Sequence, residues 1–238
     1  MTSPLQPSVL DRQRSFEWAW LGRVAYRRAW DLQEALRRRV LEDDARDTLL
    51  LLQHDPVVTL GRHADTSHVL LPEDELRARG VEVVRSSRGG DVTYHGPGQL
   101  VGYPVFRVPD GPVHHLERLA TALRLVCQGV GVTAEWRADP AGLWVGRDKL
   151  AAFGLHVSRG VAVHGFALNV ATALEAFTWI VPCGLRQTGV TSLAALIGCA
   201  LDPAELAPRV AEAVAEVAGR DAVAVPPDRL WGLLPSGA

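Results

Sequence analysis

The sequence has 238 residues, of which 47% are hydrophobic and 22% charged, and its formal net charge is −2. This balance is ordinary for a soluble globular protein, and the chain is long enough to bury a core without disulfides or metals. A general nucleic-acid-binding protein is usually basic, so the bulk charge gives no support for that function.

The cysteines and the apolar stretches indicate the compartment. The three cysteines, Cys127, Cys183 and Cys199, are sparse and odd in number, which argues against a disulfide framework and favours a reducing cytosol. The N-terminus lacks the apolar segment of a secretory signal, and no apolar stretch approaches the roughly 18–20 residues of a membrane-spanning helix. We therefore expect a cytoplasmic protein that binds neither nucleic acid nor membrane.

The predicted elements mix helices and strands along the chain. After a polar, flexible tail over 1–14, the patterns predict a helix over 15–40, strands over 48–52 and 57–60, a helix over 72–79, a strand over 81–85, a loop over 86–102, a strand over 103–108, a helix over 114–130, strands over 143–145, 149–157 and 161–170, a short helix capped by Thr191 or Ser192, and a helix over 203–217. With hairpins in the middle and no repeating βαβ pattern, this order favours an α/β fold of the α+β type with a mixed sheet. We expect residues 15–238 to form one domain.

One glycine-rich segment has the composition of a ligand-binding loop. Five of the twelve residues over 88–99, RGGDVTYHGPGQ, are glycine or proline. Glycines let the backbone approach a ligand and direct N–H groups toward it, although a wide turn between strands explains the same composition. The segment is not a P-loop, because the GxxxxGK[ST] spacing is absent.

Cys183 is the cysteine whose setting suits a nucleophile. It lies between Pro182 and Gly184, and such a turn can present the sulfur to a cleft while the following N–H groups stabilise an oxyanion. A structural cysteine remains the alternative. Cys127 lies on the apolar stripe of its predicted helix and Cys199 in an apolar run, so we expect both to pack as small hydrophobic residues.

Lys149 is the only lysine in the sequence. A free thiol has a pKa of about 8.5, so a nucleophilic cysteine needs a nearby base or cation to ionise at neutral pH. Lysine can lose its proton when partly buried and arginine cannot, which suits Lys149 to an acid–base role. An edge lysine with its ammonium group in solvent is the structural alternative.

The eight histidines form neither an HExxH motif nor a Cys/His zinc spacing, so no structural metal is expected. His95 and His164 each precede a glycine and can face a common cleft, with satisfied, non-catalytic histidines as the alternative. His114 and His115 open a predicted helix and are expected at the surface.

Four blocks of the sequence, in order, resemble the lipoate–protein octanoyltransferase family over about residues 48–193. They are TLGR at 59–62, RGGDVTYHGPGQ at 88–99, KLAAFG at 149–154 with HGFALNV at 164–170, and PCG at 182–184 followed by VTS at 190–192. The resemblance implies the fold of biotin and lipoate protein ligases. It implies that Cys183 is the nucleophile and that Lys149 lowers its pKa. It implies an acyl pocket lined by Arg88, Gly89, Gly90, Asp91, Val92, Thr93, Tyr94, His95, Ala152, Phe153, Gly154, Gly165, Phe166 and Ala167.

The resemblance also implies a reaction. An octanoyl group would pass from octanoyl-acyl carrier protein to a Cys183 thioester, and then to the target lysine of lipoyl domains in 2-oxoacid dehydrogenase E2 subunits and glycine cleavage H protein. Because one thioester replaces another, no ATP, metal or other cofactor is expected. The alternatives are an ATP-dependent lipoate ligase of the same fold and a non-catalytic acyl- or lipoyl-binding module; a cysteine protease lacks a recognisable Cys/His/Asn arrangement.

Overall fold

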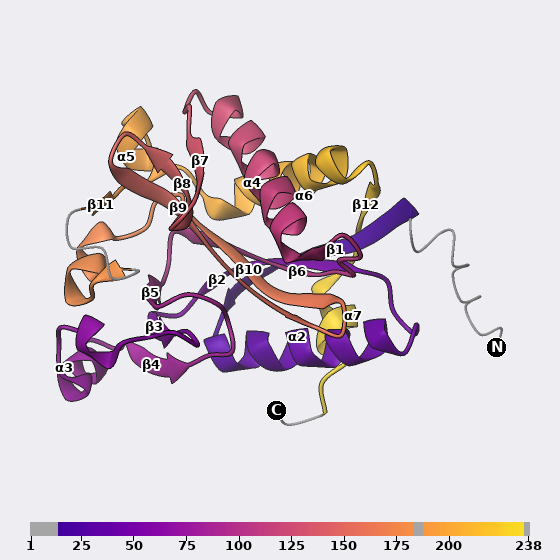
Figure 1. Cartoon of the computed structure of the whole chain (residues 1–238), viewed down its shortest axis with the longest axis horizontal. Helices are drawn as coiled ribbons and strands as arrows, with labels where there is room; N and C mark the ends of the chain where they lie inside the picture. The colour runs from indigo at the N-terminus through magenta and orange to yellow at the C-terminus, as the bar shows by residue number, and fades with distance from the viewer. Residues whose placement is uncertain (1–13, 183–187, 236–238) are drawn as a thin grey trace.

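The computed structural model describes residues 14–182 and 188–235 (Figure 1). Within these ranges nine strands form one mixed sheet in the order β12-β1-β2-β6-β10-β9-β8-β7, with β11 beside β9. Its strands are β1 (Ser15–Val24), β2 (Thr48–His54), β6 (Gln99–Val105), β7 (Glu135–Ala138), β8 (Ala141–Val145), β9 (Asp148–Ser158), β10 (Val161–Asn169), β11 (Gly189–Val190) and β12 (Asp221–Ala224). A small sheet in the order β4-β3-β5 contains β3 (Val57–Leu60), β4 (Glu82–Arg85) and β5 (Val92–His95).

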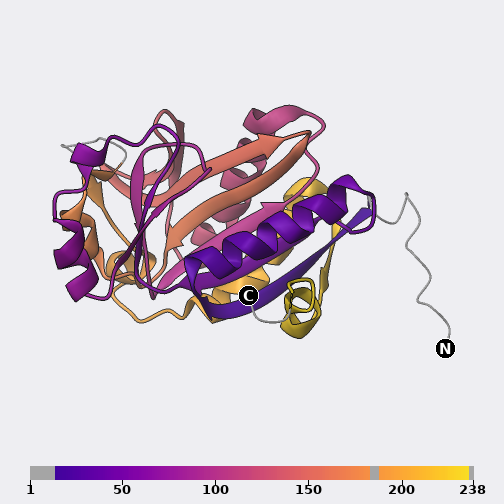
Figure 2. The ribbon, with the colours of Figure 1, turned by 90° about the horizontal axis from the view of Figure 1, so that it is seen from below.

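Helices cover both faces of the large sheet. Figure 2 shows α2 lying along one face, with α4 and α6 behind the strands on the other. The helical segments are α2 (Tyr26–Leu41), η1 (Thr66–His68), α3 (Glu73–Ala78), α4 (Gly111–Gly129), η2 (Leu174–Trp179), α5 (Leu193–Ile197), α6 (Pro203–Ala218) and α7 (Pro227–Trp231). Side chains alternate across a strand. Accordingly, Leu49 and Leu51 of β2 join the core under α4 and α6, whereas Leu50 and Leu52 join the core under α2.

The helix expected over 15–40 is wrong in its first half, because residues 15–24 form strand β1 and the helix begins at Tyr26. Successive side chains in the first part of β1 face opposite sides of the sheet. Phe16 lies in the core under α4 and α6 with Trp18 and Trp20 against it, whereas Ala19 faces α2. β1 pairs in parallel with both β2 and β12, so its conformation depends on a partner from the opposite end of the chain.

The mixed α/β sheet is confirmed, as are the strands near 48–60 and 141–170 and the helices near 73–78, 111–129, 193–197 and 203–218. The expected loop over 86–102 is wrong in part, because it contains β5 and the start of β6. The sequence patterns do not reveal the short elements β7, β12 and α7. None of the helices described in residues 14–182 and 188–235 is long and apolar enough to cross a membrane.

Of the expectations about buried and exposed side chains, the one for Cys127 is confirmed and those for Cys199 and His115 are wrong. Cys127 is fully buried, and burial raises the pKa of its thiol to about 12, so it packs as expected. Cys199 is exposed, contrary to expectation: Gly198 ends α5 in the left-handed region (φ +72°), and Cys199 follows outside the helix. His115 is buried rather than exposed, since it lies on the inner face of α4 against Phe106.

Candidate active site

A narrow cavity of about 50 Å³ lies between the RGGD segment and strands β9 and β10. Thirteen of the fourteen residues expected to bind an acyl chain line it, namely Arg88, Gly89, Gly90, Asp91, Val92, Thr93, His95, Ala152, Phe153, Gly154, Gly165, Phe166 and Ala167. The structure does not bring Tyr94 to this cavity; its ring packs against Phe177 and Trp179 instead. Tyr26, Tyr103 and His164 line the cavity as well. We call it the acyl pocket, and acyl binding by these residues stays a prediction.

Glycines explain why the first two motifs of the sequence meet. A Cβ added to Gly61, in the TLGR motif, would lie 2.3 Å from the carbonyl oxygen of Gly90, closer than any real Cβ contact. The Gly61 N–H donates to the Asp91 carbonyl at 3.1 Å. A glycine at position 61 therefore allows the end of β3 to pack directly against the RGGD segment.

Arg88 braces the pocket wall from inside and is only 8% exposed. Its Nε donates to Thr59 Oγ1 at 3.0 Å, its Nη2 to the Thr59 carbonyl at 2.5 Å and its Nη1 to the Gly89 carbonyl at 3.0 Å. A planar guanidinium suits such a fan of acceptors. Arg88 thus fixes the backbone of the RGGD segment to strand β3.

Buried histidine and tyrosine side chains line part of the pocket, and His54 lies against two of them, Tyr103 and His95. His54 Nδ1 lies 2.8 Å from the Val24 carbonyl, which can only accept, so Nδ1 carries the hydrogen and Nε2 accepts from the Tyr103 hydroxyl at 2.6 Å. Burial lowers the pKa of His54 to about 4, lowers the pKa of His95 well below its usual range and raises the pKa of Tyr103. The pocket-lining His95 and Tyr103 and the adjoining His54 are therefore uncharged at neutral pH, which suits contact with an apolar chain.

The buried His54 makes folding sensitive to acid. Its pKa is about 4 in the folded protein, against an ordinary value of about 6.5 for histidine, so between these values the unfolded chain binds a proton that the folded protein does not. We expect the free energy of unfolding to fall as pH drops from about 6.5 to about 4, by about 3 kcal/mol from this residue. Urea titrations at pH 7 and 4.5 measure the loss. A His54→Gln variant with the same pH slope as the native protein would contradict this assignment, and the exposed His114→Gln is the control.

Lys149 lies at the start of β9 and is 6% exposed. Its Nζ is 4.9 Å from the centre of the Trp144 ring, a cation–π contact, and Arg137 contacts the same ring at 5.0 Å. A Cβ on Gly142 would lie 3.1 Å from Lys149 Cε, so the absence of a side chain there makes room for the lysine. The alternative of an edge lysine in solvent does not fit this burial.

Strand β11 is tied to Lys149 from the other side. Val190 pairs with Lys149 in parallel, and the Thr191 N–H donates to the Lys149 carbonyl at 3.0 Å. The Thr191 carbonyl in turn accepts from Asn169 Nδ2 at 3.0 Å. Asn169 Oδ1 accepts from Gln99 Nε2 at 3.0 Å, and Gln99 Oε1 accepts from His95 Nδ1 at 2.7 Å. A buried chain of hydrogen bonds thus joins the Lys149 strand to the acyl pocket.

Asn169 received no role from the sequence, although it is the only asparagine in the chain, as Lys149 is the only lysine. We expect Asn169→Leu to lower acyl transfer about tenfold or more, because it removes the Asn169 donor from the buried Thr191 carbonyl and one of the two acceptors of the Gln99 amide. The free energy of unfolding should fall by about 1–3 kcal/mol. Steady-state kinetics beside urea titration measure both effects. Unchanged kinetics in a folded variant would exclude a positioning role.

Cys183 lies outside the described residues, and the segments on either side of it are anchored. Before it, the Val181 N–H donates to the His68 carbonyl at 2.7 Å, and His68 Nδ1 lies 2.6 Å from Asp91 Oδ2 in the pocket wall. After it, Gly189 pairs with Asp148 of β9. The chain thus enters this segment beside the RGGD wall and leaves it beside Lys149.

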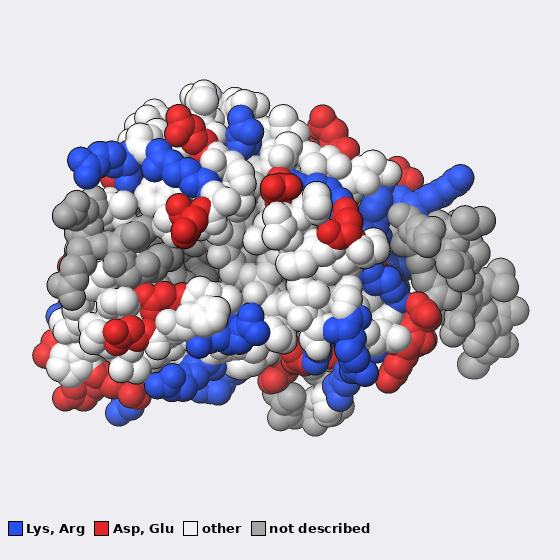
Figure 3. Space-filling view, in the orientation of Figure 1, with Lys and Arg blue, Asp and Glu red and all other residues white. Residues whose placement is uncertain are grey.

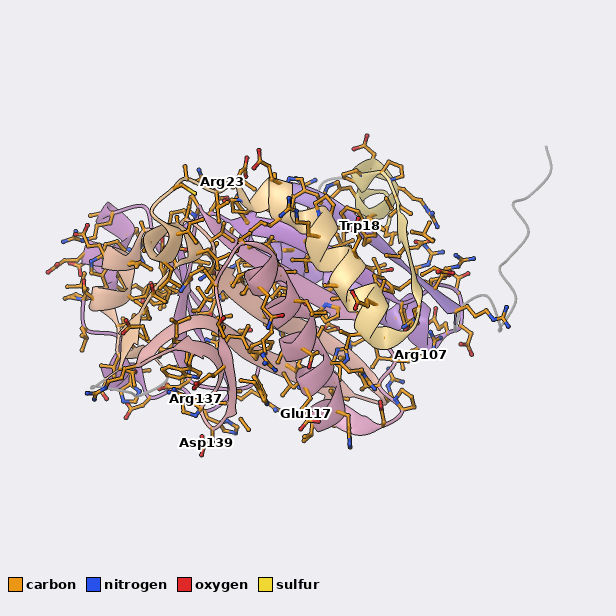
Figure 4. All side chains as sticks on the ribbon, turned by 90° about the horizontal axis from the view of Figure 1, so that it is seen from above. Trp18, Arg23, Arg107, Glu117, Arg137 and Asp139 are labelled. Atoms are coloured by element: carbon orange, nitrogen blue, oxygen red, sulfur yellow. The ribbon has the colours of Figure 1, made fainter. Side chains whose placement is uncertain are left out.

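A wider cavity of about 800 Å³ opens at the other end of the β9–β10 hairpin. Arg107, labelled in Figure 4, lines it and contacts Asp43 and Asp47, while Arg118 contacts Asp110. Arg107 and Arg118 in this cavity therefore form ion pairs within the protein. Figure 3 shows basic and acidic side chains interspersed over one face of the described residues, in keeping with the small net charge.

Comparison with known proteins identifies the family. Residues 25–215 match the family model described as "Lipoyl protein ligase A/B catalytic domain". The chain is 41% identical over 220 residues to an octanoyltransferase of Caldicellulosiruptor bescii, covering 90% of this chain and 96% of that protein. It is 44% identical over 204 residues to an octanoyltransferase of Chloroflexus aurantiacus, covering 83% and 92%.

These matches show that the chain belongs to the lipoyl protein ligase A/B catalytic family. The resemblance to the octanoyltransferases carried by the four motifs is confirmed, and the protein is an acyltransferase enzyme.

Solved structures confirm the expected ligase-type fold. A lipoate-protein ligase A bound with ATP superposes with a TM-score of 0.75 at 17% identity, covering 92% of each chain. A bi-partite lipoate protein ligase of Thermoplasma acidophilum gives a TM-score of 0.71 at 15% identity, covering 92% of this chain and 90% of that one. At these identities the likeness concerns the fold alone.

Proposed function

We propose that this enzyme transfers an octanoyl group from octanoyl-acyl carrier protein to the target lysine of lipoyl domains, including those of 2-oxoacid dehydrogenase E2 subunits and glycine cleavage H protein. The observation that carries the proposal is the pocket itself. A narrow cavity formed mainly by residues of the octanoyltransferase motifs, with uncharged His95 and Tyr103 in its lining, lies along β10 and along β9, the strand that bears the single lysine. We further propose that residues 15–238 act as one catalytic domain behind an N-terminal tail.

The proposed chemistry uses Cys183 and Lys149. The Cys183 sulfur attacks the thioester carbonyl and forms a new C–S bond while the bond to the carrier's thiol breaks. Lys149 takes the cysteine proton and passes it to the departing thiolate. The amine of the target lysine then attacks the enzyme thioester, a C–N bond forms and the bond to Cys183 breaks. Lys149 accepts the proton that the amine loses and returns it to Cys183.

Two features support this pairing. Lys149 is buried beside β11, and its backbone is clamped by Thr191 and, through it, by Asn169. The residues that flank Cys183 are anchored to the RGGD wall on one side and to the start of β9 on the other. No nucleotide enters the proposed steps, because the acyl group arrives already activated as a thioester.

Intact-mass spectrometry after mixing with octanoyl-acyl carrier protein tests the proposal. The expected result is one added octanoyl group that maps to Cys183 and disappears when a lipoyl domain is added. The absence of any adduct on the native protein would refute the thioester route. Transfer from free octanoate that requires ATP would favour the lipoate ligase alternative, and binding without transfer would favour a non-catalytic module.

A further inference from the structure

The acyl pocket ends at His164, on the side away from Lys149. Strands β9 and β10 line the pocket through the register pairs Ala152–Ala167, Phe153–Phe166 and Gly154–Gly165, and the next pair is Leu155–His164. On β9 the pocket-lining residues begin at Ala152, three residues before Leu155, which corresponds to about 10 Å at the usual rise of a strand. His164 therefore lies where the far end of a bound chain would arrive.

His164 adopts a backbone conformation that is uncommon for residues other than glycine. Its φ is +59°, in the left-handed region, although it lies inside strand β10. Such a conformation costs free energy and persists only where the surroundings impose it. Here the His164 N–H donates to Gln33 Oε1 of α2 at 2.7 Å, and Gln33 is 1% exposed.

One hydrogen-bonded pair of side chains connects the lining of the pocket with the lining of an open groove. His164 Nε2 is hydrogen-bonded to Ser87 Oγ at 2.9 Å, and His164 lines the pocket. Ser87 lines a second depression, of about 620 Å³, together with Trp30, His156 and the charged residues Arg27, Asp31, Glu34 and Arg37. The Trp30 ring lies 5.9 Å from that of His164. We call this pair the His164–Ser87 wall.

We propose that the His164–Ser87 wall sets the longest acyl chain that the enzyme accepts, and so restricts the donor to medium-chain acyl thioesters. The inference rests on the proposed function, since it takes the pocket to hold the acyl chain. Methylenes beyond those that fit would have to displace a buried imidazole or enter a groove lined by charged side chains, and both are unfavourable for an apolar chain.

His164→Gly removes the wall without adding backbone strain, because glycine adopts a φ of +59° freely. Purified enzyme is incubated with a mixture of acyl-carrier-protein thioesters of 6 to 16 carbons and a lipoyl domain as acceptor. Mass spectrometry of the acylated lipoyl domain then gives the relative transfer of each chain length. We expect the ratio of kcat/KM for the twelve-carbon donor over the eight-carbon donor to rise about tenfold or more, the size of effect that a few methylenes have in an apolar pocket.

Ser87→Ala removes the hydrogen bond but keeps the ring and should shift the same ratio in the same direction by less. If His164→Gly does not fold, the chain-length profile of Ser87→Ala alone tests the inference. Arg159→Gly is the matched control, since Arg159 has a φ of +51° at the exposed turn of the same hairpin, far from the pocket. Its profile should equal that of the native enzyme.

Native chain-length profiles in both His164→Gly and Ser87→Ala would overturn this inference while leaving the octanoyl-transfer proposal intact. A native enzyme that transfers no acyl group of any length would instead refute the proposed function, and the inference with it.

Discussion

Replacing Lys149 with arginine is expected to slow octanoyl transfer by roughly 10²- to 10⁴-fold, the usual range for a lost general acid–base group. Arginine keeps the positive charge but cannot give up its proton at neutral pH. The space is also tight, because Gly142 and the Trp144 ring enclose the end of the side chain. Single-turnover transfer to a lipoyl domain, with folding checked by circular dichroism, measures the loss.

This substitution separates two roles for Lys149. If the ammonium group only stabilises the thiolate by its charge, Lys149→Arg should stay within about tenfold of the native rate, and the proton-transfer role would then be wrong. Arg137→Gln is the matched control, because Arg137 contacts the same Trp144 ring but its side chain is 40% exposed. It should retain the native rate.

Replacing Cys183 with serine is expected to remove the acyl-enzyme and to lower turnover by about 10³-fold or more, since the nucleophile acts as a unit with its base. Mass spectrometry and rapid-quench kinetics with octanoyl-acyl carrier protein report both effects. The other cysteines provide internal controls. Cys199→Ser removes an exposed thiol and should keep full activity. An octanoyl adduct on Cys199, or substantial turnover by Cys183→Ser, would contradict the assignment of the nucleophile.

The glycine-rich parts of the pocket could be predicted from the sequence, because close contacts between two motifs require glycine at particular positions. The TLGR and RGGD motifs contain glycine because Gly61 and Gly90 touch through their backbones, and this close approach leaves a recognisable pattern. Lys149 could be recognised from composition, since it is the single lysine among 25 lysine and arginine residues.

Other features depend on partners that are distant in sequence, and local patterns do not reveal them. Asn169 is hydrogen-bonded to Gln99, 70 residues away, and to the carbonyl of Thr191, 22 residues away. Strand β1 has apolar residues at spacings that also fit a helix, and only pairing with β2 and β12 selects the extended form. Tyr94 alternates with its neighbours Thr93 and His95 on β5, so its side chain leaves the pocket that theirs line.

The burial of Lys149 has a consequence for the enzyme's own surface. On the proposed route the enzyme carries a reactive thioester that any accessible ε-amine could intercept. Here the single lysine of the chain, Lys149, is only 6% exposed, and all the other residues among its 25 lysines and arginines are arginines. Guanidinium groups stay protonated and are poor nucleophiles. If the proposed acyl-enzyme forms, the folded protein therefore presents no lysine of its own surface to the activated acyl group, so we expect no self-acylation before the acceptor binds.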